Sequence, residues 1–250
     1  MGPRVFGSAL QGAWAADGPY GALIAADSNG IQLPAGFSSR VVARSGQLVS
    51  GTGYTWHTAP DGGACFAAPG NGWSYACNSE VGSGGGGVGV LRFASDGSVV
   101  DAYRILNGTN RNCAGGPTPW GTWLSCEETP TGQVWECDPL GVSPAVARPG
   151  MGRFNHEAAA VDPVGRYIYL TEDQPDGRLY RFHPSVWPDL ATGTLEVAAV
   201  SGSSVGWSAV PDPSGAGTAT RYQVAASTAF NGGEGAWYAN GKVWFTTKGD

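Results

Sequence analysis

Positive charge is scarce in this sequence. Its 250 residues include 14 Lys and Arg against 20 Asp and Glu, which gives a net charge of −6 and a pI near 5.0. There is no run of basic residues, and this argues against a nucleic-acid partner, because nucleic-acid binding depends on neutralising phosphates. Acidic residues gathered in a pocket would instead attract cations.

Long hydrophobic runs and helix-forming stretches are also missing. No apolar segment approaches the roughly 20 residues that a membrane helix requires. Glycine accounts for 41 residues and proline for 17, and both are unfavourable inside helices. With 42% hydrophobic residues and 10 Trp, the composition is that of many short strands joined by tight turns. We therefore expect an all-β fold, in one domain that spans residues 1–250.

Several well-known functional motifs are absent. The sequence has no G-x-S-x-G nucleophile motif and no G-x-x-x-x-G-K-[ST] phosphate loop. No C-x-x-C pair suggests zinc. The five cysteines are an odd number, so at least one is unpaired within the chain. Cys126 and Cys137 flank an expected hairpin turn and could be cross-strand neighbours.

The two ends of the chain suggest how it is processed. Met1 to Leu10 contain one Arg and no long apolar stretch, so this segment lacks the pattern of a signal peptide. Either the protein is cytoplasmic or the chain begins downstream of its signal. The chain stops at Asp250, soon after the β-type run Val243–Thr247. Because a domain seldom ends on such a strand without a closing partner, we expect a C-terminal truncation.

A two-strand pattern repeats along the chain. Each copy starts with a turn glycine, continues as an aromatic or β-branched strand and ends in polar, mostly acidic residues: Gly72–Glu80, Gly121–Glu128, Gly165–Asp173 and Gly241–Asp250. A following strand recurs in step at Val90–Phe93, Val134–Cys137 and Leu179–Phe182. Periods of about 40 to 50 residues with several strands each are typical of β-propellers.

A β-sandwich is the alternative architecture, since its strands are also short and bounded by glycine. It gives no reason, however, for a two-strand pattern to recur at a constant spacing. We therefore expect a β-propeller. The Pro/Ser/Gly-rich segment 201–217 is expected to be a loop inserted within a blade.

Three potential metal ligands precede the repeat glycines. Cys113 and Glu157 each lie eight residues before such a glycine, and Glu234 lies seven residues before the next. The strand before each glycine should line the propeller channel, so these groups are expected at one level. Carboxylates brought together must protonate or bind a cation, and a thiolate with carboxylates suits a transition metal such as iron. The alternative to a metal site is that each residue has no such role: Cys113 would be a buried, inert cysteine, and Glu157 and Glu234 would be solvated surface groups.

A second set of acids ends the strands that follow. It comprises Glu80, Glu127, Glu128, Glu172 and Asp173. These residues would form a neighbouring, oxygen-rich ring suited to calcium, with solvated strand ends as the alternative. His156 would point to the opposite face from Glu157, which favours a supporting or structural role. His57 and Asp61 precede the first repeat and could supply another contact.

The segments that carry these residues resemble the PhoX-type alkaline phosphatases. The likeness is most specific over Asn112–Glu128, and it extends to Leu33–Phe37, Gly152–Ala158, Tyr167–Asp173 and Gly233–Gly235. The resemblance implies a six-bladed propeller whose iron and calcium cluster hydrolyses phosphomonoesters. This chain would end before the family's last blade.

The resemblance also assigns residues. Cys113, Glu157 and Glu234 match the family's iron-binding cysteine and glutamates at the catalytic centre, and other acids would serve calcium. Glu80 would be the acid of the first blade, where Ser79 replaces the usual histidine. The family is typically exported by the twin-arginine route, which implies a periplasmic or secreted protein.

We accordingly expect a metal-dependent phosphomonoesterase that is monomeric and acts on a small phosphate monoester. The cluster would bind the phosphate oxygens and neutralise their charge during in-line attack. Lys248 and Arg153 are the nearest basic candidates for phosphate contacts. One alternative is a calcium-dependent lactonase or esterase propeller with a single central metal. Another is a non-catalytic, ligand-binding propeller with a structural calcium.

Overall fold

A computed structural model describes residues 18–249. Met1 to Leu10, on which the signal-peptide prediction rests, and Asp250 lie outside the described residues. The chain divides into two compact units, Met1–Val42 and Ala43–Asp250. The described part of the first unit contains isolated bridges, such as Leu23 with Pro34, and no strand. Among the described residues no helix is long and apolar enough to cross a membrane.

The second unit is built from antiparallel sheets, as expected for an all-β protein. The first sheet contains β1 (Pro60–Ala68), β2 (Gly72–Ser79), β3 (Gly86–Phe93) and β4 (Val99–Thr109), and the second contains β5 (Asn112–Pro117), β6 (Trp123–Glu127), β7 (Val134–Cys137) and β8 (Val146–Ala147). The third contains β9 (His156–Asp162), β10 (Tyr167–Glu172), β11 (Leu179–Val186), β12 (Asp189–Ser201) and β13 (Ser204–Ala209). The fourth is the pair β14 (Gly233–Ala239) and β15 (Lys242–Thr247), and two 3-10 turns, η1 (Pro149–Met151) and η2 (Thr220–Tyr222), lie between strands.

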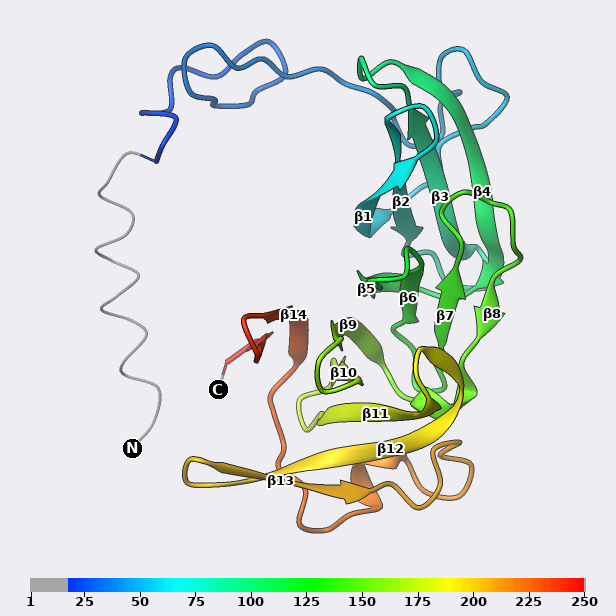
Figure 1. The fold of residues 1–250 in the computed structure, drawn as a ribbon, viewed down its shortest axis with the longest axis vertical. Coiled ribbons are helices and arrows are strands. Elements are labelled where there is room, and N and C mark those ends of the chain that lie inside the picture. The colour runs from blue at the N-terminus through cyan, green and yellow to red at the C-terminus, as the bar shows by residue number, and fades with distance from the viewer. Residues whose placement is uncertain (1–17, 250) are drawn as a thin grey trace. The chain divides into compact units, whose positions relative to one another are not determined.

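The sheets are arranged as propeller blades. Within each sheet the strands are ordered as in the chain, and the first strands β1, β5, β9 and β14 contact one another in succession. Figure 1 shows these first strands on the inner side of an arc and the later strands further out. The predicted two-strand repeat corresponds to β2, β6, β10 and β15 with the strands that follow three of them. The prediction that the strand before each repeat glycine is the inner strand of its blade is therefore confirmed.

Apolar side chains fill the spaces between neighbouring blades. One cluster joins residues of the first sheet, including Val88 and Val90, to Trp123 and Cys137 of the second. Another joins residues of the second sheet to those of the third: Leu124, Cys126 and Val134 with Ile168, Leu170, Tyr180 and Phe182. The stacking of blades is thus held by hydrophobic contact.

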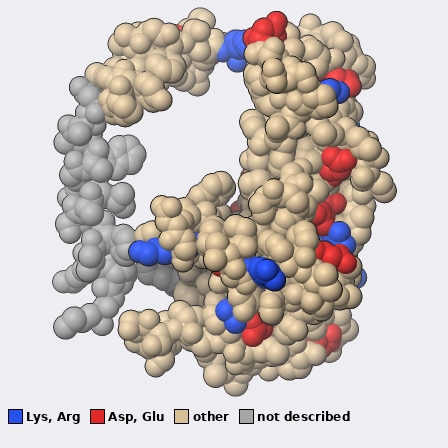
Figure 2. Space-filling view, viewed as in Figure 1, with Lys and Arg blue, Asp and Glu red and all other residues tan. Residues whose placement is uncertain are grey.

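On the face shown in Figure 2, charged side chains are sparse and no continuous basic patch is visible.

The structure corrects two details of the sequence-based expectations. Cys126 pairs with Val134 and Cys137 with Trp123, so the two cysteines are not cross-strand neighbours, and all five cysteines are free. The expected loop 201–217 is wrong for residues Ser204–Ala209, which form β13 and pair with β12. The Pro, Ser and Gly content of this segment concealed the strand that contains Trp207.

The side chain of Asn78 ties the first blade to the second. Its Nδ2 donates to the carbonyl oxygens of Cys113 (2.9 Å) and Ala114 (2.7 Å). Its Oδ1 accepts from Trp123 Nε1 and Ser125 Oγ, both at 2.8 Å. Because Asn78 is fully buried, each of these partners would lose its hydrogen bond without replacement by water if the amide were removed.

Asn78→Ala is therefore expected to lower the free energy of unfolding by about 3 kcal/mol or more, since several buried polar groups lose their partner. Urea denaturation followed by tryptophan fluorescence measures the change. Asn107→Ala, at an exposed position of β4, is the matched control and should change it by less than about 0.5 kcal/mol. Equal effects of the two substitutions would contradict this role of Asn78.

Candidate metal centre

Each first strand carries a β-bulge at the same place. The strand-end pairs are Pro60 with Ser79, Asn112 with Glu127, His156 with Glu172, and Gly233 with Thr247, and in every sheet the register shifts directly after this pair. Two residues of the first strand then oppose one residue of the second. Such bulges bend a strand and redirect its side chains.

The first residue of the bulge is a potential metal ligand in all four sheets. These residues are Asp61, Cys113, Glu157 and Glu234, which we call the inner group. The spacing from the repeat glycines predicts the last three at one level, and the structure brings them to the same position of the bulge. A fixed count from the repeat glycine misses Asp61, which the sequence offers only as a possible extra contact, because β1 has nine residues whereas β5 has six.

The inner group and its neighbours form two overlapping sets of potential ligand atoms. Cys113 Sγ lies 3.3 Å from Glu157 Oε1 and 3.7 Å from Asp61 Oδ2. The ligand atoms of Cys113, Glu128 and Glu157 all lie within 4.8 Å of one another, and those of Asp61, Glu80 and Cys113 do so as well. Cys113 is therefore shared by both sets.

A second level is formed by the residue that follows each second strand. These residues are Glu80, Glu128, Asp173 and Lys248, which we call the outer group. The carboxyl group of Glu128 lies close to that of Asp173 and within electrostatic range of Glu80. Lys248 Nζ lies 2.6 Å from Asp173 Oδ2 and 3.0 Å from Glu234 Oε1. The inner and outer groups thus form one continuous cluster.

Glu127 is a predicted ligand that the structure places elsewhere. Its carboxylate accepts hydrogen bonds from the backbone N–H groups of Asn110 (2.8 Å) and Gln133 (3.2 Å) and from Trp135 Nε1 (3.1 Å). It belongs to neither set of potential ligand atoms. The carboxylate instead anchors the turn between β6 and β7.

Glu172 occupies the corresponding position in the third sheet and is used in the same way. Its carboxylate accepts from the N–H of Arg178 (3.1 Å) and the hydroxyl of Tyr180 (3.0 Å). Arg221 Nη1 donates to its other oxygen at 3.0 Å, and Glu172 is fully buried. The structure therefore does not bring Glu172 together with Cys113.

Neither His57, a possible extra contact, nor His156, expected to have a supporting or structural role, joins the acids. His156 is fully buried, its ring stacks on Phe154 at 3.6 Å, and its Nε2 lies 3.1 Å from the carbonyl oxygen of Gly152. Burial lowers the pKa of His156 to about 3. His57 Nε2 lies 2.9 Å from the carbonyl oxygen of Asn78, and burial lowers its pKa to about 4. Arg153 is exposed.

Burial and crowding favour the protonated forms of the clustered acids. Burial, then the charges of Glu234 and Glu128, raise the pKa of Glu157 to about 8, although the hydrogen bond from Cys113 opposes this. Burial and the neighbouring Asp173 raise the pKa of Glu128 to about 7. Burial, with Glu157 nearby, also raises the pKa of the Cys113 thiol. A bound cation would reverse these shifts.

The donor set fits such a cation. A thiol suits a transition metal, whereas carboxylate oxygens suit either a transition metal or calcium. Gly62, the second residue of the bulge in β1, keeps the first two blades close together, because an added Cβ would lie 2.7 Å from the Cα of Ala114. The ligands of neighbouring blades can therefore reach one ion.

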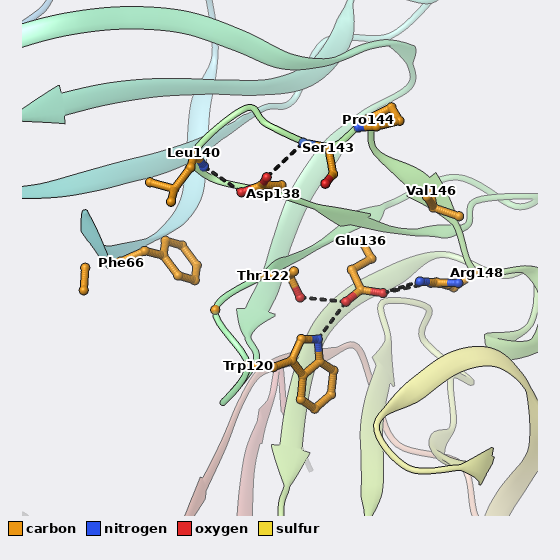
Figure 3. Close-up of a pocket in the computed structure, with 12 residues that line it drawn as sticks. Phe66, Trp120, Thr122, Glu136, Asp138, Leu140, Ser143, Pro144, Val146 and Arg148 are labelled. Atoms are coloured by element: carbon orange, nitrogen blue, oxygen red, sulfur yellow. Dashed lines mark hydrogen bonds and ion pairs between the residues drawn. The ribbon is translucent and has the colours of Figure 1, made fainter. Parts of the chain in front are cut away.

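A separate cavity of about 540 Å³ lies at the other end of the second sheet, where Phe66, Trp120, Leu140 and Arg148 are among its lining residues (Figure 3). Its central carboxylate, Glu136, accepts from Trp120 Nε1, from Thr122 Oγ1 and from Arg148. The second carboxylate of the lining, Asp138, accepts from the backbone N–H groups of Leu140, Val142 and Ser143. Since both carboxylates already have donors, the cavity offers no open acidic ligand comparable to the cluster.

The raised pKa of Glu157 predicts a pH dependence for the metal-free protein. Folded Glu157 keeps its proton up to about pH 8, whereas the unfolded side chain releases it near 4.5. Between these values the folded state binds more protons, so the free energy of unfolding should fall as pH rises from about 4.5 to about 8 and then level off. Urea denaturation of chelator-treated protein between pH 5 and 9 measures this.

Glu157→Gln should flatten this dependence, because the amide does not titrate. Metal-loaded protein is the second control, since bound cations favour the ionised carboxylate. Chelated wild-type protein that becomes more stable between pH 5 and pH 8 would contradict the prediction.

Comparison with known proteins identifies the relatives of this chain. The protein-family model described as alkaline phosphatase PhoX matches residues 74–136 and 130–249. No curated protein gave a significant match. Among solved structures, the chain is similar to Pseudomonas fluorescens PhoX in complex with vanadate, a transition-state analogue, with a TM-score of 0.63 and 19% sequence identity.

That likeness covers 75% of this chain and 58% of the Pseudomonas chain, so the protein spans less than two thirds of the length of that relative. At this level of identity the likeness establishes the fold, and it supports a β-propeller. The family model covers most of the sequence, including three of the four bulges and all but one of the clustered acids found on them or beside them. On this basis the chain belongs to the PhoX alkaline phosphatase family.

Proposed function

We propose that this protein is a metal-dependent phosphomonoesterase whose metals are held by the inner and outer groups. The observation that carries the proposal is the convergence of Cys113, Glu128 and Glu157, whose ligand atoms lie within 4.8 Å of one another. Membership of the PhoX family favours phosphate chemistry at this site. The vanadate bound by the Pseudomonas protein resembles a phosphoryl transition state, which is consistent with the same reaction class.

The residue types suggest which metals are bound. Cys113, Glu157 and Glu234 would hold iron, because a thiolate beside two carboxylates suits a transition metal. Glu80, Glu128 and Asp173 offer only oxygen ligands and would serve calcium, with Asp61 as an additional carboxylate on the inner side. When bound, these metals would polarise the phosphoryl group and offset its negative charge.

The protein's own contribution is to hold these ligands in place. The side chain of Asn78 fixes the backbone of Cys113 by donating a hydrogen bond to the carbonyl oxygen of Cys113. Thr171 plays a similar part for Glu234, because its Oγ1 donates to the carbonyl oxygen of Glu234 at 2.6 Å and accepts from the N–H of Ala158 at 3.0 Å. Ligands fixed by the backbone need little rearrangement when metal and substrate bind.

Cys113→Ser tests the iron assignment. The substitution should remove bound iron and reduce hydrolysis of p-nitrophenyl phosphate by at least about 100-fold, since a hydroxyl is a poor replacement for a thiolate ligand. Elemental analysis of the purified protein and a phosphatase assay measure the two effects. Cys65→Ser, at an exposed cysteine of β1, is the matched control and should retain both iron and activity.

A Cys113→Ser protein that keeps its full iron content would refute the assignment. Wild-type protein that binds calcium without iron and hydrolyses lactones would favour the single-metal lactonase alternative. Calcium binding without any turnover would favour a ligand-binding propeller.

The neighbouring pair Glu127 and Glu128 provides a second test. Glu128→Gln should lower the amount of bound calcium, because its carboxylate lies in the cluster. Glu127→Gln should keep the metals but destabilise the fold by about 1–3 kcal/mol, because it weakens the hydrogen bonds that this buried carboxylate accepts. Elemental analysis and urea denaturation distinguish the two outcomes. Equal metal loss in both variants would show that Glu127 is also a ligand.

A further inference from the structure

The fourth blade differs from the other three at the outer group. The residue after the second strand is an acid in the first three sheets: Glu80, Glu128 and Asp173. In the fourth sheet the same position holds Lys248, directly after the strand-end pair of Gly233 and Thr247. A ring of acids is therefore interrupted by one ammonium group.

The backbone of Lys248 is held firmly in this position. Its N–H donates to the carbonyl oxygens of Asn231 (2.8 Å) and Gly232 (3.0 Å). The N–H of Gly232 in turn donates to the carbonyl oxygen of Gln174 at 2.8 Å, and Gln174 directly follows Asp173. The end of β15 is thus connected to the turn that carries an acid of the third blade.

Gly232 also makes room for the lysine side chain. An added Cβ at Gly232 would lie 2.7 Å from Cδ and 2.9 Å from Cγ of Lys248, and 3.0 Å from Asp173 Oδ1. Gly232 has a φ of +66°, a conformation that glycine adopts readily. The path of the lysine stem toward the acids therefore depends on a glycine at this position.

The ammonium group has one donor left for a ligand. Its three N–H groups can each donate one hydrogen bond. Two directions are taken by Asp173 Oδ2 at 2.6 Å and Glu234 Oε1 at 3.0 Å. The Lys248 side chain is 56% exposed, so the third N–H can be reached from solvent beside the cluster.

We propose that Lys248 binds the substrate, donating its remaining N–H to a non-bridging oxygen of the phosphate group. This inference rests on the proposed phosphomonoesterase function. A phosphate dianion that approaches the acids is repelled by any carboxylate whose charge is not neutralised. Among the described residues, Lys248 is the one basic side chain that forms an ion pair with the inner or outer group. Its two carboxylate partners keep the ammonium charged and oriented.

Lys248→Met tests this assignment in the metal-loaded protein. We expect the KM for p-nitrophenyl phosphate and the inhibition constant of inorganic phosphate both to rise by about 10-fold or more, as for loss of a charge-assisted hydrogen bond. The kcat should change less than the KM, and the iron and calcium contents should stay the same. Lys248→Arg keeps the charge and should recover part of the phosphate affinity.

Lys242→Met is the matched control. Lys242 is the other lysine of the sequence, begins the same strand and lies over the ring of Trp244. Its substitution should leave the KM, the phosphate affinity and the metal content unchanged.

Calorimetric titration of inorganic phosphate separates this inference from the proposed function. Weaker phosphate binding by Lys248→Met than by wild type supports the inference even where wild-type protein shows no turnover. Active wild-type protein with unchanged phosphate affinity in the variant overturns the inference alone. A variant that gains one calcium ion per chain, with unchanged phosphate affinity, would show that the ammonium substitutes for a cation.

Discussion

In a regular strand, side chains alternate between the two faces of the sheet, and in a propeller both faces are buried against neighbouring blades. The bulge at the end of β1, β5, β9 and β14 interrupts this alternation at the same place in each blade. It also connects neighbouring blades. Asn78, opposite the first bulge, binds the backbone of the second, and Thr171, opposite the third, binds the backbone of the fourth. Cys113 and Glu234 are therefore each fixed partly by the blade that precedes them.

This arrangement concentrates carboxyl groups where solvation is poor. The raised pKa values of Glu128 and Glu157 reflect burial and the repulsion between neighbouring carboxylates. The proposed metals would relieve the same repulsion, because a proton and a cation are alternative ways to remove it. Glu172 shows a third arrangement, in which burial still raises the pKa but the donors around the carboxylate, including Arg221, oppose this shift without a metal. Carboxylates whose oxygens accept hydrogen bonds from surrounding donors, such as Glu172, thus lie outside the candidate centre, whereas the carboxylates crowded against other acids lie within it.

Much of this fold could be predicted from the sequence, because the turn glycines and strand patterns recur once per blade. The level shared by Cys113, Glu157 and Glu234 could be predicted for the same reason. The bulges could not, since the two residues of a bulge look like any strand residues until their partners are known. Asp61 was underestimated because the longer first hairpin changes its distance from the repeat glycine.

The limits of sequence reasoning are clearest at the acidic strand ends. Glu127 and Glu128 are adjacent and chemically identical, so composition gives no reason to separate them. The structure separates them because one ends a strand facing backbone donors, whereas the other has left the strand and faces the cluster. In the third blade, Glu172 and Asp173 repeat the division.

The same division explains how one blade can differ without disturbing the fold. The last residue of the second strand must suit the turn and the core. It is therefore restricted to side chains that accept hydrogen bonds from the donors of the turn, as Glu127 and Glu172 do, or that need no such donors. The next residue faces the open cluster, so its charge can change while the blade remains intact. Lys248 occupies this position in the fourth blade, where Gly232 accommodates its stem. The chemistry of the site is thus set blade by blade, by single residues that the repeated bulge brings to one place.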